Sequence, residues 1–278
     1  MQFAKHAANA GAPLRPVIVS VMMKLADLFA RRPMNDANHD VNAGSGNRAG
    51  QSADSRVLEM ARSDMVERQL RKRDIRSPRV LEAMNSVPRH LFVPPEHIGD
   101  AYADTPLPIG VGQTISQPFM VAAMADALLL EGSEKVLEIG AGSGYQAAVL
   151  SLLAHEVIAI ESQPSLAEAA RARLAHLGYN NVRVETADGS QGWLPDAPYD
   201  AILVTAAAPY VPPPLLGQLA EGGRLVIPVG PAKQQELLRM IKREGRTTRE
   251  SLFACRFVPL LGRFGWPPPG PAKESSRG

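Results

Sequence analysis

The chain has 278 residues, of which 45% are hydrophobic and 21% charged, enough to bury the core of one large domain. Residues 1–56 hold seven Lys or Arg and four Asp or Glu, whereas residues 57–278 hold 23 basic and 24 acidic residues. The basic excess therefore lies near the N-terminus, and the remainder gives no electrostatic reason to expect a nucleic-acid partner. One cysteine, Cys255, excludes an intrachain disulfide and a cysteine-based metal cluster, and the six histidines lack metal-binding spacing, so no metal is expected.

Residues 1–56 are interpreted as an extension outside the catalytic unit. The apolar stretch 17–23 is ended by Lys24 and Asp27, well short of the ~20 residues that a membrane span needs. We expect an unstructured segment with a flexible linker over 36–55, because that part lacks periodic apolar positions. A targeting segment and an amphipathic surface helix are the alternatives for the apolar stretch.

The remaining chain predicts an α/β fold. Apolar spacing predicts a helix over 57–70, a second helix opened by Ser77 and Pro78, and a third over about 119–130. Strands are then expected over 135–139, 156–161, 182–185, 199–205 and 224–229, with helices after the first, second and fourth of them. Two more strands over 236–243 and 251–261 precede a tail, 266–278, that we expect to be disordered. This alternation predicts a doubly wound, Rossmann-like parallel sheet with helices on both faces, in a domain spanning 57–265 with an added N-terminal helical segment.

Residues 136–144 form the most informative motif, an apolar run that contains Glu138 and ends in the alternating glycines Gly140, Gly142 and Gly144. A strand that feeds such a turn and a helix brings the backbone close to a ligand. The spacing departs from a dinucleotide fingerprint, and a carboxylate at position 138 would repel a pyrophosphate but suits a cationic group. The pattern therefore indicates a nucleoside without phosphates, for which S-adenosylmethionine is the obvious candidate.

Two further acids follow the next two strands. Glu161 ends the second strand, where a carboxylate accepts hydrogen bonds from both ribose hydroxyls; the alternative is a solvated acid at a strand end. Asp188 ends the third strand and can accept the adenine amino group, while Gly189 permits close approach, although an Asp-Gly pair alone is usually a turn. Together with Glu138 they predict one site for an adenosine and an amino acid.

The acceptor is predicted less directly. The fourth strand ends in Ala206, Ala207 and Ala208, which lack the polar group that amino-group methyltransferases place there, and no Pro-Cys pair is present for cytosine methylation. A carboxylate acceptor needs no base, because with a pKa of about 4 it is ionised at neutral pH. The polar segment 112–118 is best placed to receive it. From its position ahead of Pro118, Ser116 is more readily explained as a helix N-cap, but donors at a helix start also bind carboxylates, so both roles stay open.

The sequence resembles the protein-L-isoaspartate O-methyltransferases over about residues 65–261. The resemblance rests above all on Leu107-Pro-Ile-Gly-x-Gly-Gln-Thr-Ile-Ser-Gln-Pro118, and also on Met65-Val-x-x-Gln-Leu70, Val87-Pro-Arg-His-Leu-Phe-Val93, Val136-Leu-Glu-Ile-Gly140, Asp188-Gly189 with Gly192-Trp193, Val204-Thr-Ala-Ala207 and Arg256-Phe-Val-Pro-Leu260. Thr186-Ala187 and Ala208-Pro209-Tyr210 depart from the family's usual residues, and residues 1–56 have no counterpart in it.

The resemblance implies that Ser116 is the active-site residue, that Gln113, Thr114 and Ile115 border S-adenosylmethionine, and that Gln235 lies near it. The implied reaction methylates the free α-carboxylate of L-isoaspartyl residues in damaged proteins and peptides and starts repair through a succinimide. We also expect a cytoplasmic monomer. Two other interpretations stay open: a methyltransferase of the same fold that acts on a small-molecule acid, and a cofactor-binding module that has lost catalysis.

Overall fold

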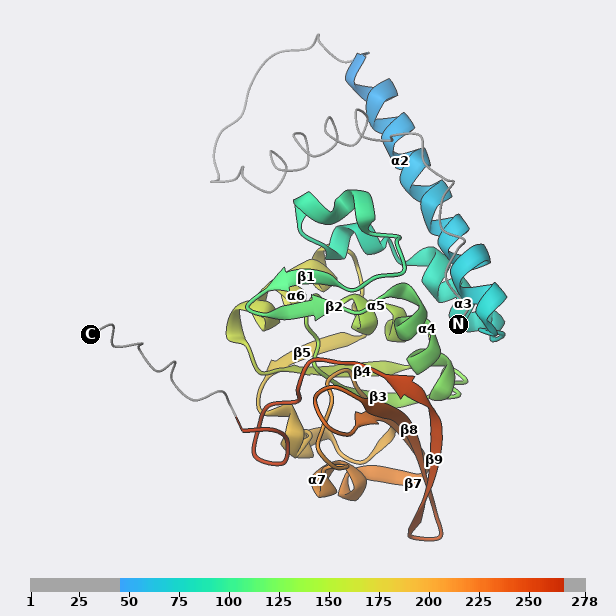
Figure 1. Cartoon of the computed structure of the whole chain (residues 1–278). Coiled ribbons are helices and arrows are strands. Elements are labelled where there is room, and N and C mark those ends of the chain that lie inside the picture. The colour runs from blue at the N-terminus through green and yellow to red at the C-terminus, as the bar shows by residue number, and fades with distance from the viewer. Residues whose placement is uncertain (1–45, 268–278) are drawn as a thin grey trace, which may run out of the picture.

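A seven-stranded sheet forms the centre of the molecule (Figure 1). The computed structural model describes residues 46–267, and it describes residues 46–54 by their backbone alone. The spatial order is β5-β4-β3-β6-β7-β8-β9, in which the first five strands are parallel and β8 is antiparallel to both neighbours. The strands are β3 (Lys135–Ile139), β4 (Glu156–Glu161), β5 (Val182–Thr186), β6 (Tyr199–Val204), β7 (Leu219–Val229), β8 (Gln235–Arg243) and β9 (Arg246–Cys255). Because the chain builds the sheet outward in both directions from β3 and β6, the topological switch point lies between these two strands.

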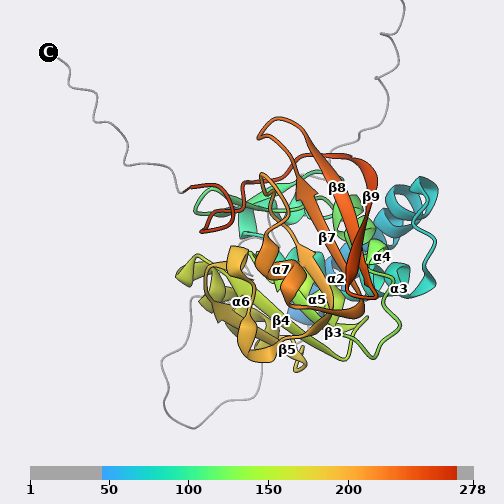
Figure 2. The same cartoon turned by 90° about the horizontal axis from the view of Figure 1, so that it is seen from below.

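Helices cover both faces of the sheet (Figure 2). On one face, Met124 of α4 and Leu150 of α5 pack against Val136 of β3. On the other face, Leu215 of α7 packs with Ile139 of the same strand. The helices are α4 (Pro118–Ala127), α5 (Tyr145–Ser151), α6 (Pro164–His176) and α7 (Pro213–Gly217), with short 3-10 turns η5 (Gly189–Gln191) and η6 (Leu194–Asp196). The predicted doubly wound α/β fold is confirmed.

A helical segment and a small hairpin precede the sheet. Its elements are α2 (Gly46–Met65), the π turn η1 (Val66–Leu70), the 3-10 turns η2 (Arg71–Arg73), η3 (Arg89–Phe92) and η4 (Pro95–Asp100), α3 (Pro78–Ser86), and the hairpin strands β1 (Leu107–Gly110) and β2 (Gln113–Ile115). The hydroxyl of Ser77 accepts a hydrogen bond from the N–H of Val80, as predicted for the cap of α3. In Figure 1 α2 projects away from the sheet, and the β1–β2 hairpin lies between the N-terminal turns and the sheet.

Several expected boundaries are wrong. The helix α2 begins at Gly46, so the linker expected over 36–55 is wrong for residues 46–55; no proline interrupts this stretch, and a helix can extend through it. The last strand spans Arg246–Cys255 rather than 251–261, because a tight turn at Glu244 and Gly245, both with positive φ, pairs it with the whole length of β8. Trp266 is packed against the sheet rather than part of a disordered tail. Residues 1–45, including the stretch 17–23, and residues 268–278 lie outside the described residues.

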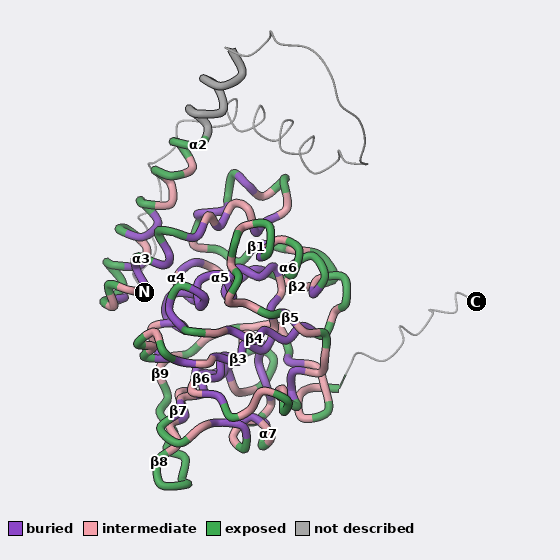
Figure 3. The backbone as a smooth tube through the Cα atoms, turned by 180° about the vertical axis from the view of Figure 1, so that it is seen from behind, coloured by how far each residue is buried: buried purple, intermediate pink, exposed green. Residues whose placement is uncertain are grey.

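Burial is concentrated in the central strands (Figure 3). After Lys135 every residue of β3 is buried, Glu138 included, whereas residues 55–64 of α2 and the far end of the β8–β9 hairpin are largely exposed. No helix among residues 46–267 is both long and apolar enough to cross a membrane. Glu138 is thus a buried acid in the middle of the sheet, next to the switch point, where ligands of such sheets bind.

Candidate active site

A tight glycine turn follows β3 at the switch point. Gly140, Gly142 and Gly144 have φ values of 96°, 53° and 86°, a region that favours glycine. A Cβ atom on Gly140 would lie 2.5 Å from the hydroxyl oxygen of Thr205, which directly follows β6. That oxygen lies 2.9 Å from the carbonyl oxygen of Ile139 and 2.7 Å from that of Gly140, so Thr205 holds the turn against the neighbouring strand. This role of Thr205 was not predicted from the sequence, although its position at the end of a strand indicates it.

Glu161, the last residue of β4, fixes the same turn from its other side. Its side chain is buried, and its two carboxylate oxygens accept hydrogen bonds from the N–H groups of Gly142 at 2.8 Å and Gln163 at 2.9 Å. The alternative of a solvated acid is therefore wrong. Because an ionised carboxylate offers about four acceptor positions, Glu161 can still accept hydroxyl groups of a ligand while it holds the turn.

Glu138 is the most unusual side chain of the site. It is 0% exposed, and neither carboxylate oxygen has a hydrogen-bond partner among the described residues. Burial, with a further contribution from nearby Glu161, raises the pKa of Glu138 well above its ordinary value. An unpaired buried carboxyl group is costly, so this position indicates a cation or a hydrogen-bond donor that a ligand brings.

A narrow crevice of about 60 Å³ lies beside the glycine turn. The structure brings six of the predicted site residues to its wall: Gln113, Thr114, Gly140, Gly142, Glu161 and Gly189. The rest of the wall comes from Ile139, Ile160, Ser162, Thr205, Ala206 and residues 258–261. A Cβ atom on Gly189 would lie 2.4 Å from Cγ2 of Ile139, so only glycine fits there. Segments far apart in the sequence thus meet at the predicted edge of the sheet.

Two other predicted residues lie in the core. Ile115 is buried at the end of β2, among the side chains under the N-terminal segment. Gln235 is also buried; its amide donates a hydrogen bond to the carbonyl of Pro231 at 2.9 Å and accepts one from the N–H of Phe257 at 2.8 Å. Gln235 therefore anchors the chain that leads from β9 to the crevice wall, and neither residue lines the crevice itself.

The carboxylate of Asp188 holds a segment of chain and does not line the crevice. One oxygen accepts hydrogen bonds from the N–H of Ser190 at 3.0 Å and its hydroxyl at 2.7 Å, and the other accepts one from the N–H of Arg263 at 2.9 Å. Burial raises the pKa of Asp188, but these hydrogen bonds together lower it more, so it lies below the ordinary value. The side-chain amide of Gln191 also donates to the second oxygen, at 3.2 Å. Contact with an adenine amino group, as predicted, would therefore require Asp188 to give up one of these four partners.

Residues 258–266, which we call the strap, form an irregular segment across this edge of the sheet. The N–H of Leu260 donates to the carbonyl of Ala207 at 2.8 Å, and the N–H of Ala207 donates to the carbonyl of Val258 at 2.8 Å. The indole N–H of Trp266 also donates to the carbonyl of Ala207, at 3.1 Å. The strap is thus attached both to the chain after β6 and to Asp188, and it supplies one wall of the crevice.

Ser116 does not cap α4. The N-cap position belongs to Gln117, which makes no capping hydrogen bond through its side chain. The N–H of Phe119 is satisfied instead by a carboxylate oxygen of Asp104 at 3.1 Å. The interpretation of Ser116 as a helix cap is therefore wrong. Asp104 caps the helix instead, a role that was not predicted from the sequence. Ser116 itself is half-buried between β2 and α4, two residues after Thr114 of the crevice wall.

The residues at this site fit S-adenosylmethionine, the ligand that the sequence indicates. Glu138 suits a cationic group and Glu161 suits hydroxyl groups, and the glycine turn allows close approach of the backbone. Among residues 46–267 no three His, Cys, Asp or Glu side chains are placed to hold a metal ion. A crevice of about 60 Å³ is small for such a ligand, since small-molecule pockets measure roughly 300–1,000 Å³. The strap is the longest part of the crevice wall that belongs to no strand or helix.

The sequence comparisons identify one family. The family model described as protein-L-isoaspartate(D-aspartate) O-methyltransferase matches residues 60–265. A protein-L-isoaspartate O-methyltransferase from Methanoculleus marisnigri is 54% identical over 205 residues, which are 74% of this chain and 93% of that protein. One from Rhodopseudomonas palustris is 53% identical over 215 residues, or 77% of this chain and 99% of that protein.

Solved structures agree with the sequence comparisons. A structure described as a protein-L-isoaspartate O-methyltransferase has a TM-score of 0.67 at 29% identity and covers 73% of this chain and 67% of its own. One from Plasmodium falciparum, described as the same kind of enzyme in complex with S-adenosyl-L-homocysteine, has a TM-score of 0.62 at 26% identity and covers 72% and 98%. On these matches, the chain belongs to the protein-L-isoaspartate(D-aspartate) O-methyltransferase family.

Proposed function

We propose a division of roles among the site residues for the reaction of this family. The enzyme transfers a methyl group from S-adenosylmethionine to the free α-carboxylate of L-isoaspartyl residues in damaged proteins and peptides. When bound, S-adenosylmethionine supplies a methyl group on a sulfonium ion. The P. falciparum relative in complex with S-adenosyl-L-homocysteine, which is what remains of this donor after transfer, supports the same use of the crevice here.

The residues of the crevice would hold this donor in distinct ways. Glu161 would accept hydrogen bonds from the ribose hydroxyls. Glu138, which is buried directly before Ile139 of the wall and does not itself line the crevice, would face the cationic amino-acid end. Gly140, Gly142 and Gly189 leave room for close approach, and Gln113 and Thr114 form the opposite wall. Asp188 would take the adenine amino group once it releases the strap, while Ile115 and Gln235 support the hairpin and the strap from the core.

Ser116 is the residue that we assign to the acceptor. The observation that carries this role is that Asp104, rather than Ser116, caps α4, so the Ser116 hydroxyl is not used by the helix beside the crevice. It would donate a hydrogen bond to the isoaspartyl carboxylate. No base is needed, because that carboxylate is ionised at neutral pH, and the site has only to align the two reactants and exclude water. In the methyl ester the backbone nitrogen that follows can attack the ester carbonyl and expel methanol, which closes a succinimide whose hydrolysis returns some normal aspartate.

Replacing Ser116 tests this role. Ser116→Ala should lower kcat on an isoaspartyl peptide by about 10- to 100-fold, because a hydrogen bond to a charged group contributes about 1.5–3 kcal/mol. The dissociation constant of S-adenosyl-L-homocysteine, measured by calorimetry, should change less than twofold. Ser116→Thr keeps a hydroxyl and should retain more activity than Ser116→Ala. Turnover of Ser116→Ala at the wild-type rate would return Ser116 to a structural role.

The acceptor itself is tested with matched peptides. Two peptides that differ only in an aspartyl or an isoaspartyl linkage are incubated with labelled S-adenosylmethionine, and methyl esters are counted. We expect esters on the isoaspartyl peptide alone. Equal incorporation into both peptides would contradict the repair function.

Three finer expectations remain our proposals: a monomer, a cytoplasmic location and no nucleic-acid partner. The near balance of 23 basic and 24 acidic residues over 57–278 supports the third, because a nucleic-acid surface is usually strongly basic. Size-exclusion chromatography with light scattering tests the first.

A further inference from the structure

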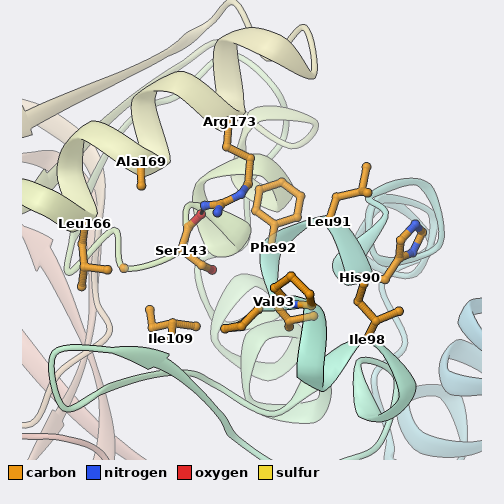
Figure 4. A pocket seen from close by; sticks show the side chains of 13 residues that line it. His90, Leu91, Phe92, Val93, Ile98, Ile109, Ser143, Leu166, Ala169 and Arg173 are labelled. Carbon is orange, nitrogen blue, oxygen red and sulfur yellow. Dashed lines mark hydrogen bonds between the residues drawn. The ribbon is translucent and has the colours of Figure 1, made fainter. Parts of the chain in front are cut away.

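An apolar pocket of about 490 Å³ adjoins the crevice and has no role in the proposed function (Figure 4). Leu166, Ala169 and Arg173 project into it from α6, where their spacing of three and four residues places them on one face of the helix. Across from them lie Phe92, Val93 and Ile98 from η3, η4 and the chain between these turns. The pocket is therefore a built cavity between α6 and the N-terminal turns.

The pocket and the crevice share a wall. Gly142 lines both of them. Ile109 of β1 also lines the pocket, and its Cδ1 atom lies 3.3 Å from where a Cβ atom on Gly142 would stand. The other strand of the same hairpin contributes Gln113 and Thr114 to the crevice. A chain that places one residue at the crevice can therefore place a nearby residue in the pocket, since an extended chain advances about 3.3–3.6 Å per residue.

One positively charged side chain, that of Arg173, lies at this apolar surface. No acidic residue lines the pocket. Burial, and to a smaller extent the charge of Arg62, lowers the pKa of His90 to about 4, so the ring of His90 is neutral at pH 7. Arg173 donates one hydrogen bond to the carbonyl of Ser143 at 2.8 Å, and its guanidinium lies 5.9 Å from the centre of the Phe92 ring. It forms no ion pair with a carboxylate among the described residues. With five N–H groups, a guanidinium that makes one hydrogen bond can bind a carboxylate.

We propose that this pocket binds a large apolar side chain of the damaged polypeptide, and that Arg173 binds a carboxylate next to that side chain. This inference rests on the proposed function, because the polypeptide substrate is what brings a chain to the shared wall at Gly142. The apolar lining and the single unpaired cation match such a segment in both polarity and charge. The pocket thereby gives the enzyme a preference for the sequence around the isoaspartyl residue.

Isoaspartyl peptides of one length test this preference. A single leucine is moved from four residues before the isoaspartyl residue to four residues after it, in a background of glycine and alanine. In the best register kcat/KM should rise on the order of tenfold over the peptide without leucine, as expected for burial of one leucine side chain. In that register, glutamate beside the leucine should be preferred to glutamine.

Variants of α6 assign the preference to the pocket. Ala169→Phe fills the cavity and should bring the ratio of kcat/KM with and without leucine close to one. Ala175→Phe is the matched control, because Ala175 is exposed on the same helix and is not part of the pocket wall; it should keep the full ratio. Arg173→Gln should remove the preference for glutamate over glutamine, an effect that a purely structural role of Arg173 would not produce.

The opposite results overturn the inference. Equal kcat/KM for every leucine register, or a full leucine preference in Ala169→Phe, would mean that no substrate side chain enters the pocket. A weaker affinity of Ala169→Phe for S-adenosyl-L-homocysteine would assign the pocket to the methyl donor instead. Failure of the wild-type enzyme to methylate any isoaspartyl peptide would contradict the proposed function rather than the pocket.

Discussion

Glu138 and Glu161 are two buried acids in one site, and their surroundings give them different properties. Glu161 accepts two backbone hydrogen bonds, whereas Glu138 has no partner among the described residues. Burial without donors keeps the proton on Glu138 at a pH where an exposed glutamate has lost it. The surroundings of Glu138 thus favour the neutral form of its carboxyl group, whereas a cationic ligand would favour the ionised form.

Glu138→Gln should make this visible in the pH dependence of stability. Because the pKa of Glu138 is raised in the folded protein, its contribution to the free energy of unfolding is fully present below pH 4.5. That contribution is lost as the pH rises from 4.5 through the folded-state pKa, by about 1.4 kcal/mol per pH unit between these two values. Glutamine mimics the neutral form, so the variant should unfold at higher urea concentration than the wild type at pH 8 and at a similar concentration at pH 4. It should also bind S-adenosyl-L-homocysteine more weakly at pH 8. Parallel stability curves for the two proteins would contradict this account.

Local motifs were enough to pick out Glu138 and Glu161 as candidates, whereas contacts between distant parts of the chain could not be predicted from the sequence. The glycine turn and Glu138 are contiguous, so their pattern could be read directly. The partner of Asp188 is Arg263, 75 residues later in the chain, and no local pattern connects them. Ser116 shows the same limit, because only the fold brings Asp104 to the start of α4 and so removes the need for a cap at Ser116.

The start of α4 joins the N-terminal segment to the catalytic domain. Asp104 accepts the N–H of Phe119 and also pairs with Arg73, whose guanidinium lies 3.6 Å from the centre of the Phe119 ring. The helix α4 therefore begins in a fixed position. Ser116, which lies two residues before the helix and which we assign to the acceptor, is held in place with it. Strands β3 to β6 were predicted to within one residue, because β3 and β4 are continuous apolar runs between clear turns. The strand β7 begins at Leu219 rather than at 224, and β9 was misplaced, since neither start is marked by such a run.

Asp104→Ala should loosen this junction. Loss of a capping carboxylate costs about 1 kcal/mol, so the urea midpoint should fall, and kcat on an isoaspartyl peptide should fall with it because Ser116 is less well placed. Asp100→Ala is the control, since Asp100 is exposed at the end of η4. A variant with reduced stability but unchanged kcat would separate the cap from the position of Ser116.

At the scale of the whole molecule, the strap connects the chain after β6 with the chain after β5, two parts of the site that the sheet alone does not join. It is bonded to Ala207 beyond β6 and to Asp188 beyond β5, and it narrows the crevice to about 60 Å³. Movement of the strap away from the crevice would break this small set of hydrogen bonds and would unfold no strand or helix. Motions of this kind set the turnover of many enzymes.

Asp188→Ala should release one end of the strap. Trp266 reports on it, because the chain has two tryptophans and a Trp193→Phe background leaves Trp266 as the single one. In stopped-flow fluorescence, Asp188→Ala should bind S-adenosyl-L-homocysteine with a several-fold higher association rate constant and release it faster still. If Asp188 serves the adenine alone, only the dissociation rate constant should rise.

The position of the strap in the sequence also sets the order in which the site is completed during synthesis. Every strand of the sheet precedes residue 258 and leaves the ribosome before the strap does. Because Ala207 and Asp188 lack their partners in the strap until then, the crevice wall is complete only after residues 258–266 have been made. The segment that closes the site is thus among the last of the described residues to be synthesised.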